Sequence, residues 1–259
     1  MDASGPAQAL PSLTVLVVDD NDVNRLFMQH LLRKNGHIPI AAANGREALD
    51  AVAAQAVDCI LMDIQLPDMD GVAVTKAIRE GACGPANPPE VPILALTAYA
   101  LPSDRQRCLE AGMNAHVAKP VRGPDLFAAI AQVLGYARPS AGGSHAPALD
   151  LSEFSQKGRQ QFAAELLSLF LGLAEPKGRD LADAVARGDL TVAKGLAHDL
   201  AGMSGPIRAE GLGRAMRRLQ DACRAGDLAA CRESHALAGQ ALDTVLRAVR
   251  AHPYLTASP

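Results

Sequence analysis

Two patterns of apolar and polar residues divide this chain near residue 140. Up to Leu134, short apolar runs alternate with segments of helical periodicity, which is typical of a strand–helix repeat and a parallel sheet. The apolar runs predict strands at about 13–18, 38–42, 57–62, 91–96 and 114–118. Such an alternation favours an α/β domain built on a doubly wound parallel sheet.

Beyond Leu149 the strand pattern stops and helical periodicity dominates. Helices are expected at about 159–173, 177–187, 189–204, 209–225 and 228–250, with Pro176 and glycine-containing turns between them. Short connections predict antiparallel neighbours, so this half is predicted to be an all-α, antiparallel helical bundle. A stretch rich in Pro, Gly and Ser indicates a linker between the halves. The expected divisions are a tail at 1–12, an α/β domain at 13–135, a linker at 136–149 and a helical domain at 150–252.

Chemically distinctive side chains follow four of the predicted strands. The first strand ends in Asp19 and Asp20, the third in Asp63, the fourth in Thr97 and the fifth in Lys119. Because the carboxyl ends of parallel strands share one edge of the sheet, these groups should converge. Three carboxylates make a hard oxygen site suited to Mg²⁺. The hydroxyl and the ammonium can then neutralise the oxygens of a phosphoryl group that moves in line onto the third-strand carboxylate.

Residues 13–135 resemble the receiver domain of two-component response regulators. The matching segments are 17–25, 43–49, 61–71, 95–98 and 118–120. The resemblance implies a flavodoxin-like fold with five parallel strands and phosphorylation of Asp63. It also implies that Thr97 and Lys119 contact the phosphoryl oxygens and that the peptide bond before Pro120 is cis. One departure is His116, which stands where the family usually has an aromatic switch residue.

The same resemblance implies a set of magnesium ligands. Asp20 and Asp63 would bind Mg²⁺ directly, Asp19 would bind through a water molecule, and the backbone carbonyl of Gln65 would complete the protein ligands. A phosphatase of the haloacid dehalogenase type also uses an aspartate at a strand end, but it needs a second acid two residues later. Gln65 occupies that position here, which argues against the phosphatase.

Each of these residues also has a simpler interpretation. Asp20 or Asn21 can cap the helix that follows, Thr97 alone can be a turn hydroxyl, and Lys119 alone can be a solvated charge. Together, at four strand ends and in this order, they favour the receiver site.

His198 is the distinctive residue of the helix expected at 189–204. The predicted core stripe of this helix comprises Leu190, Ala193, Leu196, Ala197, Leu200 and Ser204. His198 projects about 160° from that stripe, toward solvent. Gly195, Gly202 and Gly205 surround it, although glycine inside a helix costs about 1 kcal/mol relative to alanine. A cleared helix surface would let another protein's active site reach an imidazole, which is a competent phosphoryl nucleophile near neutral pH.

The helical half resembles a histidine-containing phosphotransfer (HPt) domain over about 150–250. The segments that carry this resemblance are 197–205, 209–212 and 219–222. It implies that His198 carries the phosphoryl group. The departure is Ala201, where the family usually has a lysine that steadies the phosphoryl oxygens; either Lys194 or Arg208 can be considered as a replacement.

A second His-x-Leu-Ala-Gly pattern occurs at His235 on the last helix. His235 projects to the same side as Leu228, Cys231, Ala238, Leu242, Leu246 and Val249, so it is predicted to lie at the edge of the core. The remaining histidines have no evident partners in the sequence and are assigned no chemistry: His30, His37, His145 and His252.

Composition restricts the function further. The net charge of −3, the absence of tryptophan and the lack of a basic tail argue against nucleic-acid binding. The five cysteines show no close pairing in the sequence, so neither a zinc site nor a disulfide framework is expected, and they suit a reducing cytosol. The N-terminal residues do not resemble a signal peptide, and no apolar run is long enough for a membrane span. A cytoplasmic protein without membrane partners is therefore expected.

The sequence thus predicts a phosphorelay intermediate that accepts a phosphoryl group on Asp63 and transfers it through His198. Without a Gly-x-x-x-x-Gly-Lys loop or other ATP site, the donor would be a sensor histidine kinase, another phosphodonor, or a kinase region outside this sequence, as in hybrid histidine kinases. The acceptor would be a downstream receiver domain or HPt protein, and whether the chain counts as an enzyme is left open. The alternative is a receiver switch whose degenerate bundle only binds a partner or drains phosphate; Ala201 favours it and the glycines around His198 argue against it.

Overall fold

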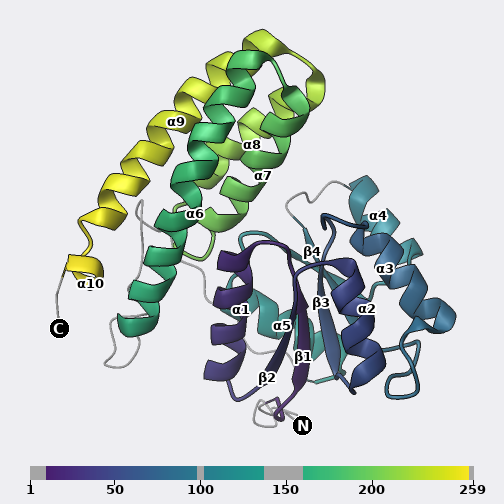
Figure 1. The fold of residues 1–259 in the computed structure, drawn as a ribbon. Coiled ribbons are helices and arrows are strands. Elements are labelled where there is room, and N and C mark those ends of the chain that lie inside the picture. Colours follow the sequence, from purple (N-terminus) through teal and green to yellow (C-terminus); the bar gives the residue numbers. More distant parts are fainter. Residues whose placement is uncertain (1–9, 98–101, 137–159, 257–259) are drawn as a thin grey trace, which may run out of the picture. The chain divides into compact units, whose positions relative to one another are not determined.

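The computed structural model describes residues 10–97, 102–136 and 160–256 (Figure 1). The chain forms two compact units, residues 1–143 and 144–259. The division lies within the linker predicted at 136–149, of which all but Tyr136 is outside the described residues. Most of the predicted tail at 1–12 is outside them as well.

The first unit is built on a five-stranded parallel sheet. Its strands are β1 (Thr14–Val18), β2 (Ile38–Ala42), β3 (Cys59–Asp63), β4 (Ile93–Thr97) and β5 (Ala115–Ala118). The strand order is β2-β1-β3-β4-β5 and every pairing is parallel. This order confirms the predicted flavodoxin-like, doubly wound sheet.

Helices cover both faces of this sheet. They are α1 (Asp22–Lys34), α2 (Gly45–Ala54), α3 (Gly71–Ala77), which continues into the π-helical turn η1 (Ile78–Ala82), α4 (Pro102–Glu110) and α5 (Gly123–Val133). In Figure 1, α1 and α5 lie on one face of the sheet, and α2, α3 and α4 lie on the other. Since β1, β3 and β4 are covered on both sides, their residues are almost all buried. This explains why these strands are continuous apolar runs rather than alternating ones.

The start of α1 decides between two readings of the acidic pair that precedes it. The side-chain oxygen of Asn21 accepts hydrogen bonds from the backbone N–H groups of Val23 and Asn24, 3.1 and 3.3 Å away. Asn21 is therefore the N-cap of the helix. The capping role does not fall to Asp20.

The second unit is a helical bundle. Its elements are α6 (Gln160–Arg187), α7 (Leu190–Ser204), α8 (Glu210–Ala225), α9 (Leu228–Arg250) and the short α10 (Pro253–Thr256). The carboxylates of Asp189 and Asp227 cap α7 and α9 directly after tight turns. Helices α6 to α9 pack side by side and are joined by these short connections, as expected for the predicted helical bundle (Figure 1). At Gly213, a Cβ atom would lie 2.5 Å from the buried hydroxyl of Ser204, so glycine permits the close packing of α8 on α7.

The predicted break at Pro176 is wrong. A single helix, α6, runs through this residue. Proline removes one backbone donor and crowds the carbonyl of the residue four positions earlier, which ordinarily kinks or ends a helix. Here Phe170 and Ala174 before the proline and Leu181 after it are all buried in the bundle core. Packing on both sides of Pro176 outweighs the local penalty.

The helices described above were compared with the length of apolar helix that spans a bilayer. None of them has an apolar stretch of the length that crossing a bilayer requires.

Candidate functional site

Three carboxylates from two strand ends come together at the carboxyl edge of the sheet. Asp19 and Asp20 follow β1 directly, and Asp63 is the last residue of neighbouring β3. One oxygen from each carboxylate lies within 4.8 Å of the others. Asp19 and Asp63 are buried and Asp20 is partly exposed, so the cluster opens to solvent on the side of Asp20.

The ammonium of Lys119 is inserted between two of these carboxylates. Its Nζ lies 2.8 Å from Asp19 Oδ2 and 2.5 Å from Asp63 Oδ2, and all three side chains are less than a tenth exposed. Lys119 directly follows β5, and its peptide bond to Pro120 is cis, as the receiver resemblance implies. The sheet thus brings together residues separated by as many as 100 positions in the sequence.

A further residue, Asn24 on α1, orients the first carboxylate. Its Nδ2 donates to both oxygens of Asp19 at 3.2 Å, and the backbone N–H of Asn21 donates to Asp19 Oδ1 at 3.0 Å. The sequence reasoning assigned no role to Asn24. Its position could have suggested this role. Asn24 lies in the first turn of α1, and α1 begins directly after the end of β1, where the acidic pair lies.

The loop after β3 lies against Asp63, the candidate phosphate acceptor. The backbone N–H of Gln65 donates to Asp63 Oδ1 at 3.3 Å. A Cβ atom on Gly71 would lie only 2.1 Å from the backbone oxygen of Asp63. Glycine is therefore required at the start of α3 by close backbone approach, and it keeps the loop folded over the strand end.

Thr97 ends β4, and His116 lies within the neighbouring strand β5. Thr97 is the last residue of β4 and half-buried, and its carbonyl accepts the backbone N–H of Lys119 at 2.7 Å. His116 is half-buried in β5, opposite Ala95 of β4. Residues 98–101, which follow Thr97, are outside the described residues.

Burial and charge act in opposite directions on these groups. Burial raises the pKa of Asp63 to about 7; Lys119 opposes this rise, while Asp19 and Asp20 add to it. Burial alone would lower the pKa of Lys119, but Asp19 and Asp63 together raise it above its usual range. The ammonium of Lys119 therefore stays charged, whereas Asp63 loses its proton less readily than an ordinary carboxyl group.

The cluster fits a divalent cation by its chemistry. Oxygen atoms bound to one Mg²⁺ at about 2.1 Å lie at most about 4.2 Å apart, close to the 4.8 Å span of this cluster. Lys119 offsets one of three negative charges when all the carboxylates are ionised. A divalent cation would balance the remaining two.

In the bundle, His198 lies at the edge of the core rather than on an open solvent face. The buried stripe of α7 is wider than predicted, because it also includes Ala201 and Met203. His198 is half-buried, and its Nδ1 lies 3.3 Å from the side-chain nitrogen of Gln220 on α8. The prediction of a bare solvent face is corrected: α8 covers one side of the ring.

Gln220 is the second residue that sequence reasoning missed. It is 1% exposed, and among the described residues its Oε1 has no hydrogen-bond partner. A side-chain amide can present either its oxygen or its nitrogen to a neighbouring imidazole, and the choice is linked to the tautomer of the ring. Gln220 is therefore placed to decide which nitrogen of His198 keeps its lone pair.

The surroundings of His198 also include an ion pair. Lys177 of α6 contacts the carboxylate of Asp199, the residue after His198. Ala201, which replaces the usual lysine of the family, is 7% exposed. Lys194 and Arg208, the two proposed replacements, are both half-buried.

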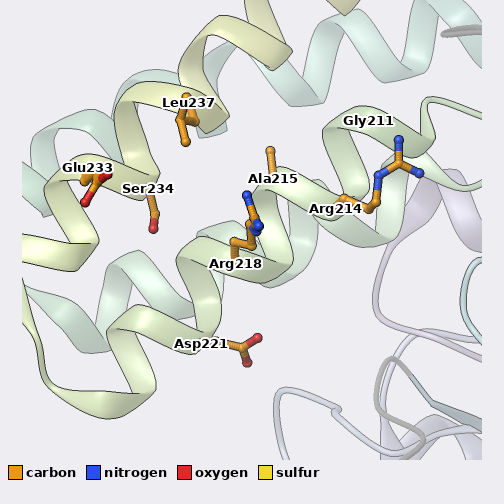
Figure 2. A pocket seen from close by; sticks show the side chains of 8 residues that line it. All are labelled: Gly211, Arg214, Ala215, Arg218, Asp221, Glu233, Ser234 and Leu237. Atoms are coloured by element: carbon orange, nitrogen blue, oxygen red, sulfur yellow. The ribbon is translucent and has the colours of Figure 1, made fainter.

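His235 lies away from this arrangement. It is half-buried on α9, and burial lowers its pKa, in keeping with the predicted position at the core edge. Beside it is a groove of about 710 Å³ between α8 and α9, shown in Figure 2. The groove is lined by Gly211, Arg214, Ala215, Arg218, Asp221, Glu233, Ser234 and Leu237. Neither candidate phosphate carrier, Asp63 or His198, lines it.

Two other histidines have partners that the sequence did not reveal. His37 is buried, its Nδ1 accepts the backbone N–H of Leu13 at 3.3 Å, and its ring lies against Phe127. His252 accepts the backbone N–H of Tyr254. These contacts are structural, so assigning no chemistry to either residue remains reasonable.

Two cysteines that are separate in the sequence meet in space. The Sγ atoms of Cys223 on α8 and Cys231 on α9 are 3.3 Å apart, and both thiols are buried. The spacing of the cysteines in the sequence does not show this contact, because it is the tight α8–α9 turn that brings the two residues together. All five cysteines are free thiols, and burial raises the pKa of Cys223 to about 12.

Comparisons with known proteins match both units. A family model described as the response regulator receiver domain matches residues 15–131, and one described as the Hpt domain matches residues 165–252. The polar-differentiation response regulator DivK of Brucella anthropi is 35% identical over 122 residues, which cover 47% of this chain and 96% of DivK. The sensor histidine kinase GacS of Pseudomonas protegens is 33% identical over 182 residues, which cover 65% of this chain.

This chain spans only 20% of the length of that GacS and 15% of the length of sensor protein GacS from Pseudomonas syringae. Among solved structures, the receiver domain of sensor histidine kinase PA1611 from Pseudomonas aeruginosa PAO1, with a magnesium ion in its active site cleft, is 37% identical. The match covers 48% of this chain and 99% of that domain, with a TM-score of 0.43.

Proposed function

Since this chain belongs to the response regulator receiver family and carries an Hpt domain after its receiver domain, we propose that it is a phosphorelay intermediate in which Asp63 accepts a phosphoryl group and His198 passes it on. The observation that carries the proposal is the contact of the Lys119 ammonium with the buried carboxylates of Asp19 and Asp63. Three acids and one ammonium at the carboxyl edge of a parallel sheet form a site for phosphoryl transfer to a carboxylate.

At the receiver site, a carboxylate oxygen of Asp63 attacks the phosphorus of the donor. The new bond joins Asp63 to phosphorus, and the bond from phosphorus to the donor nitrogen or oxygen breaks. Mg²⁺, held by Asp19, Asp20, Asp63 and the carbonyl of Gln65, would neutralise charge on the phosphoryl oxygens when bound. Lys119 is already beside Asp63 and supplies a second positive charge without a large rearrangement.

At the bundle site, Nε2 of His198 attacks the phosphoryl group and the carboxylate of Asp63 leaves. Nε2 is a nucleophile only when its lone pair is free, which in the neutral ring requires the proton to be on Nδ1. Gln220 lies on the Nδ1 side, and its otherwise unpaired Oε1 can accept that proton's hydrogen bond. We assign Gln220 the role of holding the reactive tautomer.

A second candidate function is a receiver switch with a bundle that does not transfer phosphate. It is favoured by the burial of Ala201, which leaves an uncharged side chain where the family usually carries a cation. The position of Gln220 against His198 favours the relay, because a bundle that only binds a partner has no need to orient an imidazole.

The proposed partners follow from this chemistry. The donor would be a sensor histidine kinase or another phosphodonor, and the acceptor a separate receiver or HPt protein. We expect the relay to operate in the cytoplasm, a reducing compartment in which the five free thiols would persist.

Labelling the full chain tests the proposal. A phosphorylated donor kinase with Mg²⁺ should give alkali-labile acyl phosphate on the receiver domain and acid-labile phosphohistidine on the bundle. Mixing Asp63→Asn chains with His198→Gln chains then asks whether one chain can supply another. Acyl phosphate without any phosphohistidine, in either experiment, would support the non-transferring switch.

We expect the Gln220→Met variant to transfer phosphate to His198 about tenfold more slowly, since loss of one buried hydrogen bond costs about 1–2 kcal/mol. The Gln220→Glu variant is the matched comparison, because its carboxylate can only accept a hydrogen bond and so favours the Nδ1–H tautomer. Its transfer rate should stay within about threefold of wild type. Rapid-quench labelling of both variants measures the two rates. Fast transfer by Gln220→Met, or none by Gln220→Glu despite a folded bundle, would contradict the tautomer assignment.

A further inference from the structure

We infer that the ion pair between Lys177 and Asp199 is part of the phosphotransfer machinery: Lys177 neutralises the carboxylate next to His198 so that the histidine can accept a dianionic phosphoryl group. Lys177 is then a positioning residue that acts through Asp199. The inference rests on the proposed role of His198 as phosphate carrier.

The pair joins two helices beside the phosphate-carrier candidate. Lys177 is on α6 and Asp199 on α7, and their side chains are 30% and 26% exposed. An ion pair in this partly buried position is screened less than one on the open surface. The contact therefore holds the Asp199 carboxylate toward α6 and keeps its charge compensated.

The need for compensation is electrostatic. A phosphoryl group carries about two negative charges near neutral pH. Successive side chains on a helix do not face each other, but screening by physiological salt acts only over about 8 Å and is weaker for partly buried charges, so neighbouring charges still interact. Without Lys177, Asp199 would repel the incoming group, and the Ala201 position provides no cation to offset that repulsion.

Two other basic residues lie on or next to α7. Lys194 lies one turn before His198, and its ammonium acts on Cys223 of α8, where it opposes the rise in the pKa of that thiol. Arg208 follows the end of α7 in a left-handed backbone conformation with φ of 53°. Lys177, in contrast, directly contacts the carboxylate of the residue that follows His198.

The test uses phosphoramidate, a small phosphoryl donor that labels histidine without a partner protein. All chains in this test carry Asp63→Asn, so that no label can reach His198 through the receiver domain. In this background, the Lys177→Gln variant should be labelled at His198 about five- to tenfold more slowly than the chain that keeps Lys177. Lys177→Arg should stay within twofold, and the Lys177→Gln/Asp199→Asn double variant, which removes both charges, should return to within twofold.

Glu175→Gln provides the matched control. It breaks a different ion pair of α6, between Glu175 and Arg250 of α9, and should leave the labelling rate unchanged. Thermal melts identify variants that fail to fold. Equal rates for wild type and Lys177→Gln, or no recovery in a folded double variant, would overturn the inference.

Phosphoramidate also separates the two hypotheses. If the charge effect is present but donor-labelled Asp63 never passes its phosphate to His198, the inference stands and the relay proposal fails. If phosphoramidate does not label His198 in wild type, both fail.

Discussion

Replacing Asp63 with asparagine is expected to abolish phosphorylation of the receiver domain by a donor kinase and by small acyl phosphates. The amide is not a nucleophile, and it removes one of the three carboxylates of the proposed magnesium site. Asp50→Asn is the matched control, because Asp50 is exposed on α2 and should retain wild-type labelling. Labelling with a radioactive phosphoryl donor measures both, and robust labelling of the Asp63→Asn receiver would disprove the assignment. Chelation of Mg²⁺ should also stop labelling of the wild type.

The same substitution is expected to stabilise the metal-free chain. Burial raises the pKa of Asp63 from 3.8 to about 7, so the folded state binds this proton more tightly than the unfolded state does. The resulting stabilisation is fully present below pH 3.8 and is lost as the pH rises through about 7. Asp63→Asn should therefore gain about 1–3 kcal/mol at pH 8 and less at pH 5.

Urea unfolding in the presence of a chelator measures this difference. Mg²⁺ should reduce the gap between wild type and Asp63→Asn at pH 8, because it binds the folded wild type. If Asp63→Asn increases the free energy of unfolding equally at pH 8 and pH 5, burial does not raise the pKa of Asp63 as inferred here.

The second large effect is expected at the bundle. His198→Gln should remove all phosphohistidine, since its side-chain amide cannot replace the imidazole nucleophile. His235→Gln is a natural control, because His235 lies in the same His-x-Leu-Ala-Gly pattern. It should keep the label but lose about 1 kcal/mol of stability, since His235 is half-buried on α9.

Acid-labile phosphate on the purified variants, with a urea unfolding curve for each, checks both expectations. If the label moves to His235, or survives in His198→Gln, the placement of the phosphate carrier on α7 is wrong.

Several features of the receiver domain could be predicted because they depend on short-range patterns. The central strands are continuous apolar runs, and a parallel sheet requires their carboxyl ends to share one edge. The convergence of Asp19, Asp63 and Lys119 follows from that rule, although they are far apart in the sequence. The roles assigned to these residues stay predictions until labelling is measured.

The misjudged features depend on how helices rotate and pack against one another. Pro176 is a local signal for a helix end, but buried contacts on both sides of it keep α6 continuous. The periodicity of α7 identified an apolar face but underestimated its width, because the width depends on where α8 lies. His198 therefore lies half-buried at the edge of that face.

The sequence by itself determined the fold class, the strand ends and the residues of the acidic cluster, since apolar periodicity and strand direction are encoded locally. Only the tertiary structure decided the partners of the candidate histidine. Gln220, which contacts His198, lies 22 residues after it in the sequence, and Lys177, which contacts Asp199, lies 22 residues before that residue. Helical periodicity shows which residues share a face, but not which residue of a neighbouring helix that face meets. That choice depends on the rotation and axial shift of each helix, which the packing of the whole bundle core sets.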